Sequence, residues 1–200
     1  MIVITNPSFI EDEIKIIHSL FEEGLCLLHI RKPDFSNLEM AHFINSIKME
    51  FRSKLVLHSH HDLAKDFGIN RIHFSKKDRN SPSRFSKPCE CKNQFISTST
   101  HSIEDFNSLE NDFDYAFLSP VFKSISKENY ESKTDLFKAL KSRTNYKTKI
   151  IALGGIHSEN IRKTLENGFD NIALLGAVWS NTNPVKEFKL CQQIVLSHLQ

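Results

Sequence analysis

Short runs of apolar residues alternate with amphipathic segments along the whole chain. Strands buried on both faces are apolar without a polar alternation, and such runs are typical of parallel sheets. Segments with apolar residues every three or four positions lie between the runs and are typical of helices. The runs predict eight strands, at Ile2–Thr5, Cys26–Ile30, Lys54–His58, Arg71–Phe74, Phe95–Thr98, Tyr115–Leu118, Ile150–Leu153 and Asn171–Leu175.

The intervening segments predict a helix in nearly every connection. The expected helices are Ile10–Glu23, Asn37–Phe51, Asp62–Phe67, Ser102–Leu109, Asp135–Lys141, Ser158–Asn167 and Val185–His198. The polar stretch Ser75–Lys92 lacks a clear helix, and Pro120–Thr134 is a long irregular connection of the kind that often forms a lid. No linker divides the chain, so we expect a single domain over residues 1–200. Strand–helix alternation predicts an α/β protein, a (β/α)8 TIM barrel or, less favoured, a doubly wound open sheet.

Two of the predicted strands end in glycine and favour the barrel. One reads Ala152-Leu-Gly-Gly-Ile156 and the next Ile172-Ala-Leu-Leu-Gly-Ala177, with a helical segment between them. Glycine lets backbone N–H groups approach an anion closely, and a following helix N-terminus favours negative charge. Glycine turns after the last two strands are the usual phosphate site of such barrels. The pattern therefore predicts a phosphate-binding enzyme.

Polar side chains gather where the other predicted strands end. They include His29 and Arg31, the run from His58 to His61, His73 to Asp78, and Ser97 to Ser102. In (β/α)8 barrels the C-terminal strand ends carry the chemistry. Histidine, hydroxyl and basic groups together suit a ligand with a phosphate and a second anionic group, and a proton-transfer step.

Each of these groups also has a purely structural interpretation. His29 and Arg31 share one side of the strand and could cap the sheet beside an aspartate. Ser102 suits a helix N-cap, with Asp105 three residues on, which leaves His101 unexplained. The segment Ser124–Lys127 could be a solvated connection. His58 and His60 have the spacing of two metal ligands at a strand end, so a metal-dependent hydrolase stays an alternative.

Composition narrows the classes of protein further. The 26 basic and 24 acidic side chains nearly balance at +2, which excludes the concentrated basic face of a nucleic-acid binder. No apolar run reaches about 18 residues and the first residues lack signal-peptide features, so we expect a cytoplasmic protein without membrane contact. Cys89 and Cys91 form a C-x-C pair without a matching second pair, which argues against zinc there and against a disulfide framework.

At this point the chain resembles the thiamin phosphate synthase/TenI superfamily, whose members are barrels that bind thiazole phosphate. The resemblance runs through nearly the whole chain. Its most specific pieces are Ser99-Thr-His-Ser102, Asp114-Tyr-Ala-Phe-Leu-Ser-Pro-Val-Phe122 leading to Ser124-x-Ser-Lys127, and the two glycine-ended strands. The resemblance implies a thiamine-biosynthesis protein with a small-molecule thiazole phosphate as its partner. It leaves a homo-oligomer open.

The sequence departs from the synthase pattern where that branch holds Mg²⁺ and pyrophosphate. At the second strand, Gln-x-Arg-x-Lys becomes His29-Ile-Arg31-Lys32-Pro33. At the third, Asn-Asp becomes His58-Ser59, and at the fourth Gly-Gln-x-Asp becomes Ser75-Lys-Lys-Asp78. One of two carboxylate ligands is lost and Lys76 and Lys77 are added nearby, which should weaken Mg²⁺ binding.

These changes resemble the other branch, the TenI-like thiazole tautomerases, which move a proton on a thiazole carboxylate phosphate without a metal. The resemblance gives the acid/base role to His101, since histidine both accepts and donates protons near neutral pH. His29, Arg31, His58 and Ser99 would bind the substrate. Ser124, Ser126 and Lys127 would close over it, and Gly155, Leu175 and Gly176 would hold its phosphate. This assignment needs no metal and no cofactor.

Two alternatives remain beside the tautomerase and the hydrolase. The chain could be a thiamin phosphate synthase, a transferase that joins thiazole phosphate to hydroxymethylpyrimidine pyrophosphate. Asp78 would then be the protein ligand of Mg²⁺, and Lys32 and Lys76 would neutralise pyrophosphate. It could also be a non-catalytic protein that binds thiazole phosphate.

Overall fold

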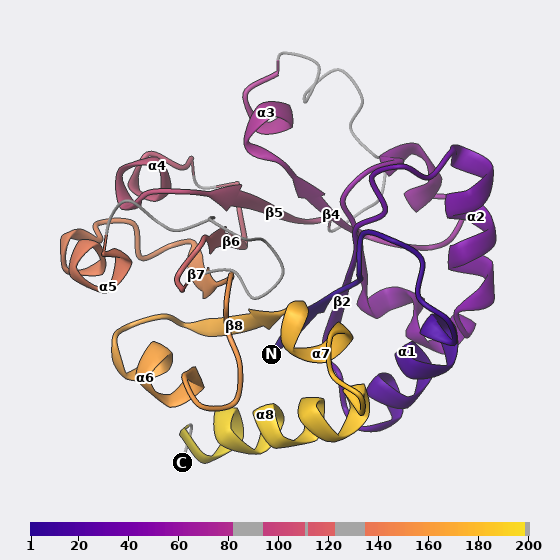
Figure 1. The fold of residues 1–200 in the computed structure, drawn as a ribbon. Helices are drawn as coiled ribbons and strands as arrows, with labels where there is room; N and C mark the ends of the chain where they lie inside the picture. The colour runs from indigo at the N-terminus through magenta and orange to yellow at the C-terminus, as the bar shows by residue number, and fades with distance from the viewer. Residues whose placement is uncertain (82–93, 111, 123–134, 199–200) are drawn as a thin grey trace.

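The eight predicted strands form one closed barrel in chain order, and every neighbouring pair is parallel. The computed structural model describes residues 1–81, 94–110, 112–122 and 135–198. Figure 1 shows the helices arranged around the strands. The predicted (β/α)8 barrel is therefore confirmed, and the open sheet is excluded because β1 pairs with β8.

The strands lie where the apolar runs predicted them, with ends shifted by a few residues. They are β1 Ile2–Ile4, β2 Leu27–Ile30, β3 Leu55–Leu57, β4 Arg71–Phe74, β5 Phe95–Thr100, β6 Tyr115–Leu118, β7 Lys149–Ala152 and β8 Asn171–Leu174. Only β5 extends two residues beyond its predicted end, because it pairs with β6 as far as Thr100 and Leu118.

The helices differ more from the prediction. The described helices are α1 Glu13–Glu22, α2 Asn37–Ser46, α3 Lys76–Arg79, α4 Ile103–Asn107, α5 Leu136–Ala139, α6 Ile161–Glu166, α7 Gly176–Trp179 and α8 Pro184–His198. Short 3-10 turns are η1 Met49–Lys54, η2 His61–Ala64 and η4 Leu140–Ser142.

Three helix predictions need correction. The segment predicted as one helix from Asn37 to Phe51 ends at Ser46, and Ile47 is extended before η1 begins. The stretch predicted to lack a helix contains α3, which Ser75 caps by accepting a hydrogen bond from the Asp78 N–H. The third connection, predicted to be helical from Asp62 to Phe67, forms only the turn η2. Elements of about one turn leave no readable hydrophobic period.

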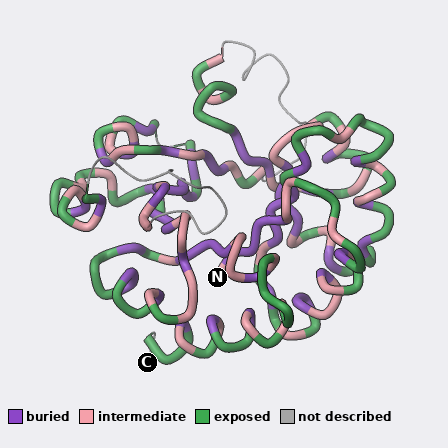
Figure 2. Tube along the Cα trace, in the orientation of Figure 1, coloured by how far each residue is buried: buried purple, intermediate pink, exposed green. Residues whose placement is uncertain are grey.

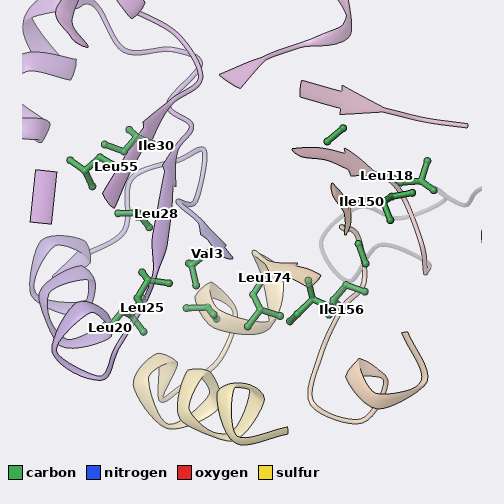
Figure 3. Close-up of a cluster of buried hydrophobic side chains, with 14 of the residues drawn as sticks. Val3, Leu20, Leu25, Leu28, Ile30, Leu55, Leu118, Ile150, Ile156 and Leu174 are labelled. Atoms are coloured by element: carbon green, nitrogen blue, oxygen red, sulfur yellow. The ribbon is translucent and has the colours of Figure 1, made fainter. Parts of the chain in front are cut away.

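Successive strand residues point to opposite sides, so both sides of the barrel wall are apolar. The larger cluster lies between strands and helices and includes Leu28, Leu55 and Ile150. Figure 2 shows the buried strands inside an exposed outer surface, and Figure 3 shows part of this cluster. A smaller cluster fills the barrel interior and consists of Ile2, Ile4, Tyr115, Phe117, Ile151 and Ala173.

The last elements of the chain close the barrel against the first strand. The Nε1–H of Trp179, in α7, donates to the backbone oxygen of Ile4 at 2.6 Å. The helix α8 then packs on α1, α6 and α7. No helix in the described part of the chain combines the length and apolar character needed to cross a membrane.

Candidate active site

A pocket of about 620 Å³ opens at the C-terminal ends of the strands, which is the size of a site for a small molecule. The pocket collects most of the predicted site residues from five different strand ends. Arg31, His58, Ser99, His101, Gly155, Leu175 and Gly176 all line it. His29 is fully buried and reaches the pocket through His58. The predicted closing residues Ser124, Ser126 and Lys127, and most of the predicted lid, lie outside the described residues.

The first glycine turn depends on backbone conformations that side chains disfavour. Gly154 has a φ of 98° and Gly155 a φ of 64°. A Cβ on Gly154 would lie 2.9 Å from the Cα of Pro120, closer than real contacts allow. The Asn160 side chain fixes the turn, since its Nδ2 donates to the Gly155 oxygen at 2.8 Å and its Oδ1 accepts from the His157 N–H at 3.0 Å. The turn is therefore held rigid beside the pocket.

The second glycine turn follows β8. Leu175 precedes α7 and Gly176 is its first residue, and both line the pocket. Because β7 and β8 are neighbours in the barrel, the two turns lie on the same side of the pocket. The structure therefore places both turns at the pocket, and their phosphate-binding role stays a prediction.

His101 lies exposed at the wall of the pocket, and its hydrogen bond shows that Nδ1 carries a hydrogen. Its Nδ1 is 2.9 Å from the backbone oxygen of Ser119. A carbonyl oxygen only accepts, so Nδ1 carries a hydrogen, and in the neutral ring Nε2 keeps its lone pair. Ser102 caps α4 by accepting from the Asp105 N–H at 3.2 Å, which confirms the structural interpretation of that serine. His101 thus has one nitrogen able to accept a proton.

Three histidines meet at the floor of the pocket and below it. The Nδ1 of His29 is 2.8 Å from the Nε2 of His58, and the Nε2 of His29 is 2.7 Å from the Tyr115 hydroxyl. His73 is 2.9 Å from both Ser97 Oγ and Ser99 Oγ, and its ring stacks on that of His58.

Burial keeps these three imidazoles neutral. It is the main reason that the pKa values of His29 and His58 lie well below their ordinary value, and the neighbouring His73 lowers both further. Burial, with smaller contributions from His61 and Arg31, lowers the pKa of His73 to about 3. At neutral pH the floor of the pocket therefore carries lone pairs rather than positive charge.

The sequence placed His73 among the polar groups at the strand ends but gave it no role in the site, and it did not single out Tyr115. His73 is the third residue of β4, as His29 is the third of β2. This equivalent position in the two strands could have indicated that His73 belongs to the site. Tyr115 begins β6 and resembles an ordinary core residue in sequence. Only closure of the barrel brings its hydroxyl to His29.

The interpretation of His58 and His60 as paired metal ligands is wrong. The Nε2 of His60 lies 2.8 Å from the Phe35 oxygen, and its Nδ1 contacts the Asn37 side chain. The strand β3 ends at Leu57, and His60 itself has a φ of 53°. The alternation that places residues i and i+2 on one side no longer holds there. The hydrolase built on this pair loses its basis.

The cations around the pocket are unequally available. Lys32 lines the pocket, but its Nζ is bound by Glu13 Oε2 at 2.6 Å and by the Ser8 oxygen at 3.1 Å. Lys76 is 3.3 Å from Asp105, a carboxylate that it shares with Arg79. Arg31 is exposed and lines the pocket. Arg31 and the half-exposed Lys76 can meet an anionic ligand, whereas the charge of Lys32 is neutralised internally.

The described residues do not match the Mg²⁺ site of a synthase. Asp78 is exposed, and its Oδ2 accepts from the Ser75 hydroxyl at 2.6 Å. Among the described residues that line the pocket, none carries a carboxylate. Mg²⁺ prefers carboxylate and phosphate oxygens. Any Mg²⁺ here would depend mainly on the oxygens of its substrates.

Among known proteins, the chain is similar in sequence to thiamine-phosphate synthases. A thiamine-phosphate synthase of Prochlorococcus marinus is 26% identical over 189 residues, 92% of this chain, but the chain spans only 52% of that relative. A thiamine-phosphate synthase of Clostridium tetani is 25% identical over 185 residues, which cover 90% of this chain and 85% of the relative.

A solved structure gives the same result. The crystal structure of thiamine phosphate pyrophosphorylase from Bacteroides thetaiotaomicron is 28% identical and superposes with a TM-score of 0.77. The match covers 98% of this chain and 96% of that one. These names support the synthase alternative more than the expected tautomerase. Residues 1–178 also match the family model described as thiamine monophosphate synthase, and the chain therefore belongs to that family.

Proposed function

We propose that this protein is a thiamine-phosphate synthase, which joins thiazole phosphate to hydroxymethylpyrimidine pyrophosphate. The observation that carries the proposal is a single pocket with two places for anions. The glycine turns after β7 and β8 form one, and Arg31 and Lys76 stand beside the ends of β2 and β4 as the other. The names of the relatives support the same activity.

The condensation requires mainly positioning and charge stabilisation. The bond between the pyrimidine methylene carbon and a pyrophosphate oxygen breaks, and its electron pair leaves with pyrophosphate. The thiazole nitrogen supplies the pair for the new C–N bond, so no proton has to move. In this chain Arg31 would take up the charge that develops on the leaving group, while the glycine turns hold the thiazole phosphate.

A second candidate, the thiazole tautomerase, is favoured by one specific observation. The Nε2 of His101 keeps a lone pair beside a pocket in which no described lining residue is a carboxylate. In that reaction His101 would take a proton from one position of the thiazole carboxylate phosphate and return it to another. Arg31 would hold the carboxylate. Cytoplasmic location and a homo-oligomer stay predictions for either function.

The first test is formation of thiamine phosphate from both substrates, measured by thiochrome fluorescence with Mg²⁺ and with EDTA. We expect the wild-type protein to form thiamine phosphate in at least one of these two conditions. Arg31→Gln should lower kcat/KM roughly 100-fold, the usual loss for one charge-stabilising group. The control Lys15→Gln removes an exposed cation on α1 and should not change it.

Absence of product under both conditions would overturn the synthase proposal. The tautomerase is then tested by following the thiazole carboxylate phosphate by NMR, with His101→Ala as the variant. Full turnover by His101→Ala would contradict the proton-transfer role of His101. Ligand binding without turnover in either reaction would indicate the non-catalytic protein.

A further inference from the structure

The three histidines at the pocket floor present their nitrogens to one another. One ring nitrogen from each of His29, His58 and His73 can be chosen so that all three lie within 4.8 Å of one another. In tetrahedral zinc sites the metal–nitrogen distance of about 2.0–2.1 Å separates two ligating nitrogens by roughly 3.3 Å. The closest pair here is 2.8 Å apart, so side-chain shifts of about an ångström would bring all three onto one ion.

The hydrogen bonds of His73 allow the tautomer that leaves a lone pair on Nε2 for a ligand. The Ser97 hydroxyl has the Ile72 oxygen as an acceptor at 3.3 Å, and when it donates there it accepts from His73 Nδ1 at 2.9 Å. The Nε2 of His73 is then unprotonated. It faces Ser99, whose hydroxyl can turn away to solvent in the pocket because Ser99 lines it.

The groups around the rings match those of metal-binding histidines. A ligating imidazole usually has its other nitrogen held by a hydrogen bond, which fixes the ring. Tyr115 does so for His29 and Ser97 does so for His73, and both of these rings are buried. His58 and His73 also line the pocket, so water or a ligand can reach a fourth coordination position.

We propose that His29, His58 and His73 form a binding site for a divalent transition-metal ion, with Zn²⁺ as the best match for three imidazoles and one open position. The site would hold the ion at the floor of the pocket. The proposal does not depend on the proposed function, since it concerns metal binding by the protein alone.

The test measures Zn²⁺ bound to the full chain after treatment with EDTA and dialysis against Zn²⁺. We expect the wild-type protein to bind one equivalent of Zn²⁺, and we expect this binding to depend on His29, His58 and His73. Loss of a residue that only hydrogen-bonds to a metal ligand costs roughly 10–100-fold in metal affinity. His58→Ala removes a ligand itself and should weaken Zn²⁺ binding by at least this factor. Ser97→Ala should weaken it by that amount without removing a ligand. Circular dichroism checks that each variant is folded.

Two controls separate this site from other ligands. His60→Ala removes a nearby histidine outside the cluster, and Cys89→Ser/Cys91→Ser removes the C-x-C thiols; both should bind Zn²⁺ as the wild type does. In the wild type, Co²⁺ should give the visible bands of tetrahedral coordination without thiolate charge-transfer bands. NMR signals of the three imidazoles should shift on Zn²⁺ addition even if His58→Ala fails to fold. Less than stoichiometric binding by the wild type, or unchanged binding by folded His58→Ala, would overturn the proposal.

Discussion

Gly154 shows how one residue determines the shape of the phosphate turn. Its φ of 98° lies in the range that glycine tolerates, and its Cα faces the backbone of Pro120. Val121 and Phe122 then donate hydrogen bonds to the oxygens of Leu153 and Gly154, at 3.0 and 3.1 Å. The turn after β7 and the segment after β6 therefore pack against each other at a place where no side chain has room.

Gly154→Ala should destabilise the protein by about 1–3 kcal/mol more than Gly168→Ala. Both glycines have a φ near 100°, so both variants carry the same backbone strain of about 1–3 kcal/mol. Only Gly154 adds overpacking, at about 1–3 kcal/mol, because nothing lies within 4 Å of a Cβ on Gly168. Urea unfolding measures both, and equal losses would show that the contact with Pro120 is unimportant. Ligand affinity should fall only for Gly154→Ala.

At the scale of elements, a buried ion pair joins α1 to the connection after β2. The side chains of Lys32 and Glu13 are 0% and 5% exposed, and their charged atoms are 2.6 Å apart. The Lys32 ammonium also lies over the rings of Phe35 and Phe43, at 5.6 and 5.2 Å. This connection carries Arg31 at its start, so the pair holds the wall of the pocket beside that cation.

Lys32→Met should lower the free energy of unfolding by about 3–5 kcal/mol, because it leaves the Glu13 charge buried without a partner. The double variant Glu13→Leu/Lys32→Met should recover most of this loss, since no charge is then buried. Thermal or urea unfolding measures both. Lys189→Met breaks the exposed pair with Glu23 and should cost at most about 1 kcal/mol. A similarly small loss for Lys32→Met would contradict the role assigned to the buried pair.

At the scale of the whole molecule, the buried histidines link stability to pH. Folding lowers the pKa values of His29, His58 and His73, and the unfolded chain therefore binds protons that the folded chain excludes. The stability that depends on these neutral rings is fully present above the unfolded-state pKa of about 6.5. It is lost as the pH falls toward the pKa values of the folded protein. For His73 the loss continues to about pH 3.

The free energy of unfolding, measured in urea with EDTA present, should fall between pH 6.5 and 4.5. Each of the three histidines contributes at most about 1.4 kcal/mol per pH unit in this range. His58→Gln removes one titrating group and should make the dependence shallower. His42→Gln removes an exposed histidine on α2 and should leave the slope as it is. A pH-independent stability over this range would show that the buried rings accept protons without unfolding.

Sequence patterns predicted the barrel because each strand is apolar on both faces. Arg71–Phe74 and Tyr115–Leu118 were predicted with the bounds that the structure gives. The glycine turns were predictable for a similar reason, since they depend on residue type at a strand end. Elements such as α3 and α7 were not, because four residues are too few to show a helical period.

The arrangement of side chains within the site was less predictable. His29 and His73 come from β2 and β4, which are not neighbours, so their meeting depends on how the barrel closes around β3. The direction of His60 depends on where β3 stops, which the alternation in sequence does not reveal. Sequence therefore located the strand ends that form the pocket, but not the contacts among them.

The indole of Trp179, which donates a hydrogen bond to Ile4, is a fluorescent reporter that the protein already contains. Trp179 is the single tryptophan of the chain, and it lies at the seam between the first strand and α7, three residues beyond Gly176. Its fluorescence emission comes from one known place, without overlap from other indoles. Emission changes during refolding would follow closure of the seam, and changes on adding a phosphate ester would follow occupancy of the adjacent turn, without any attached dye.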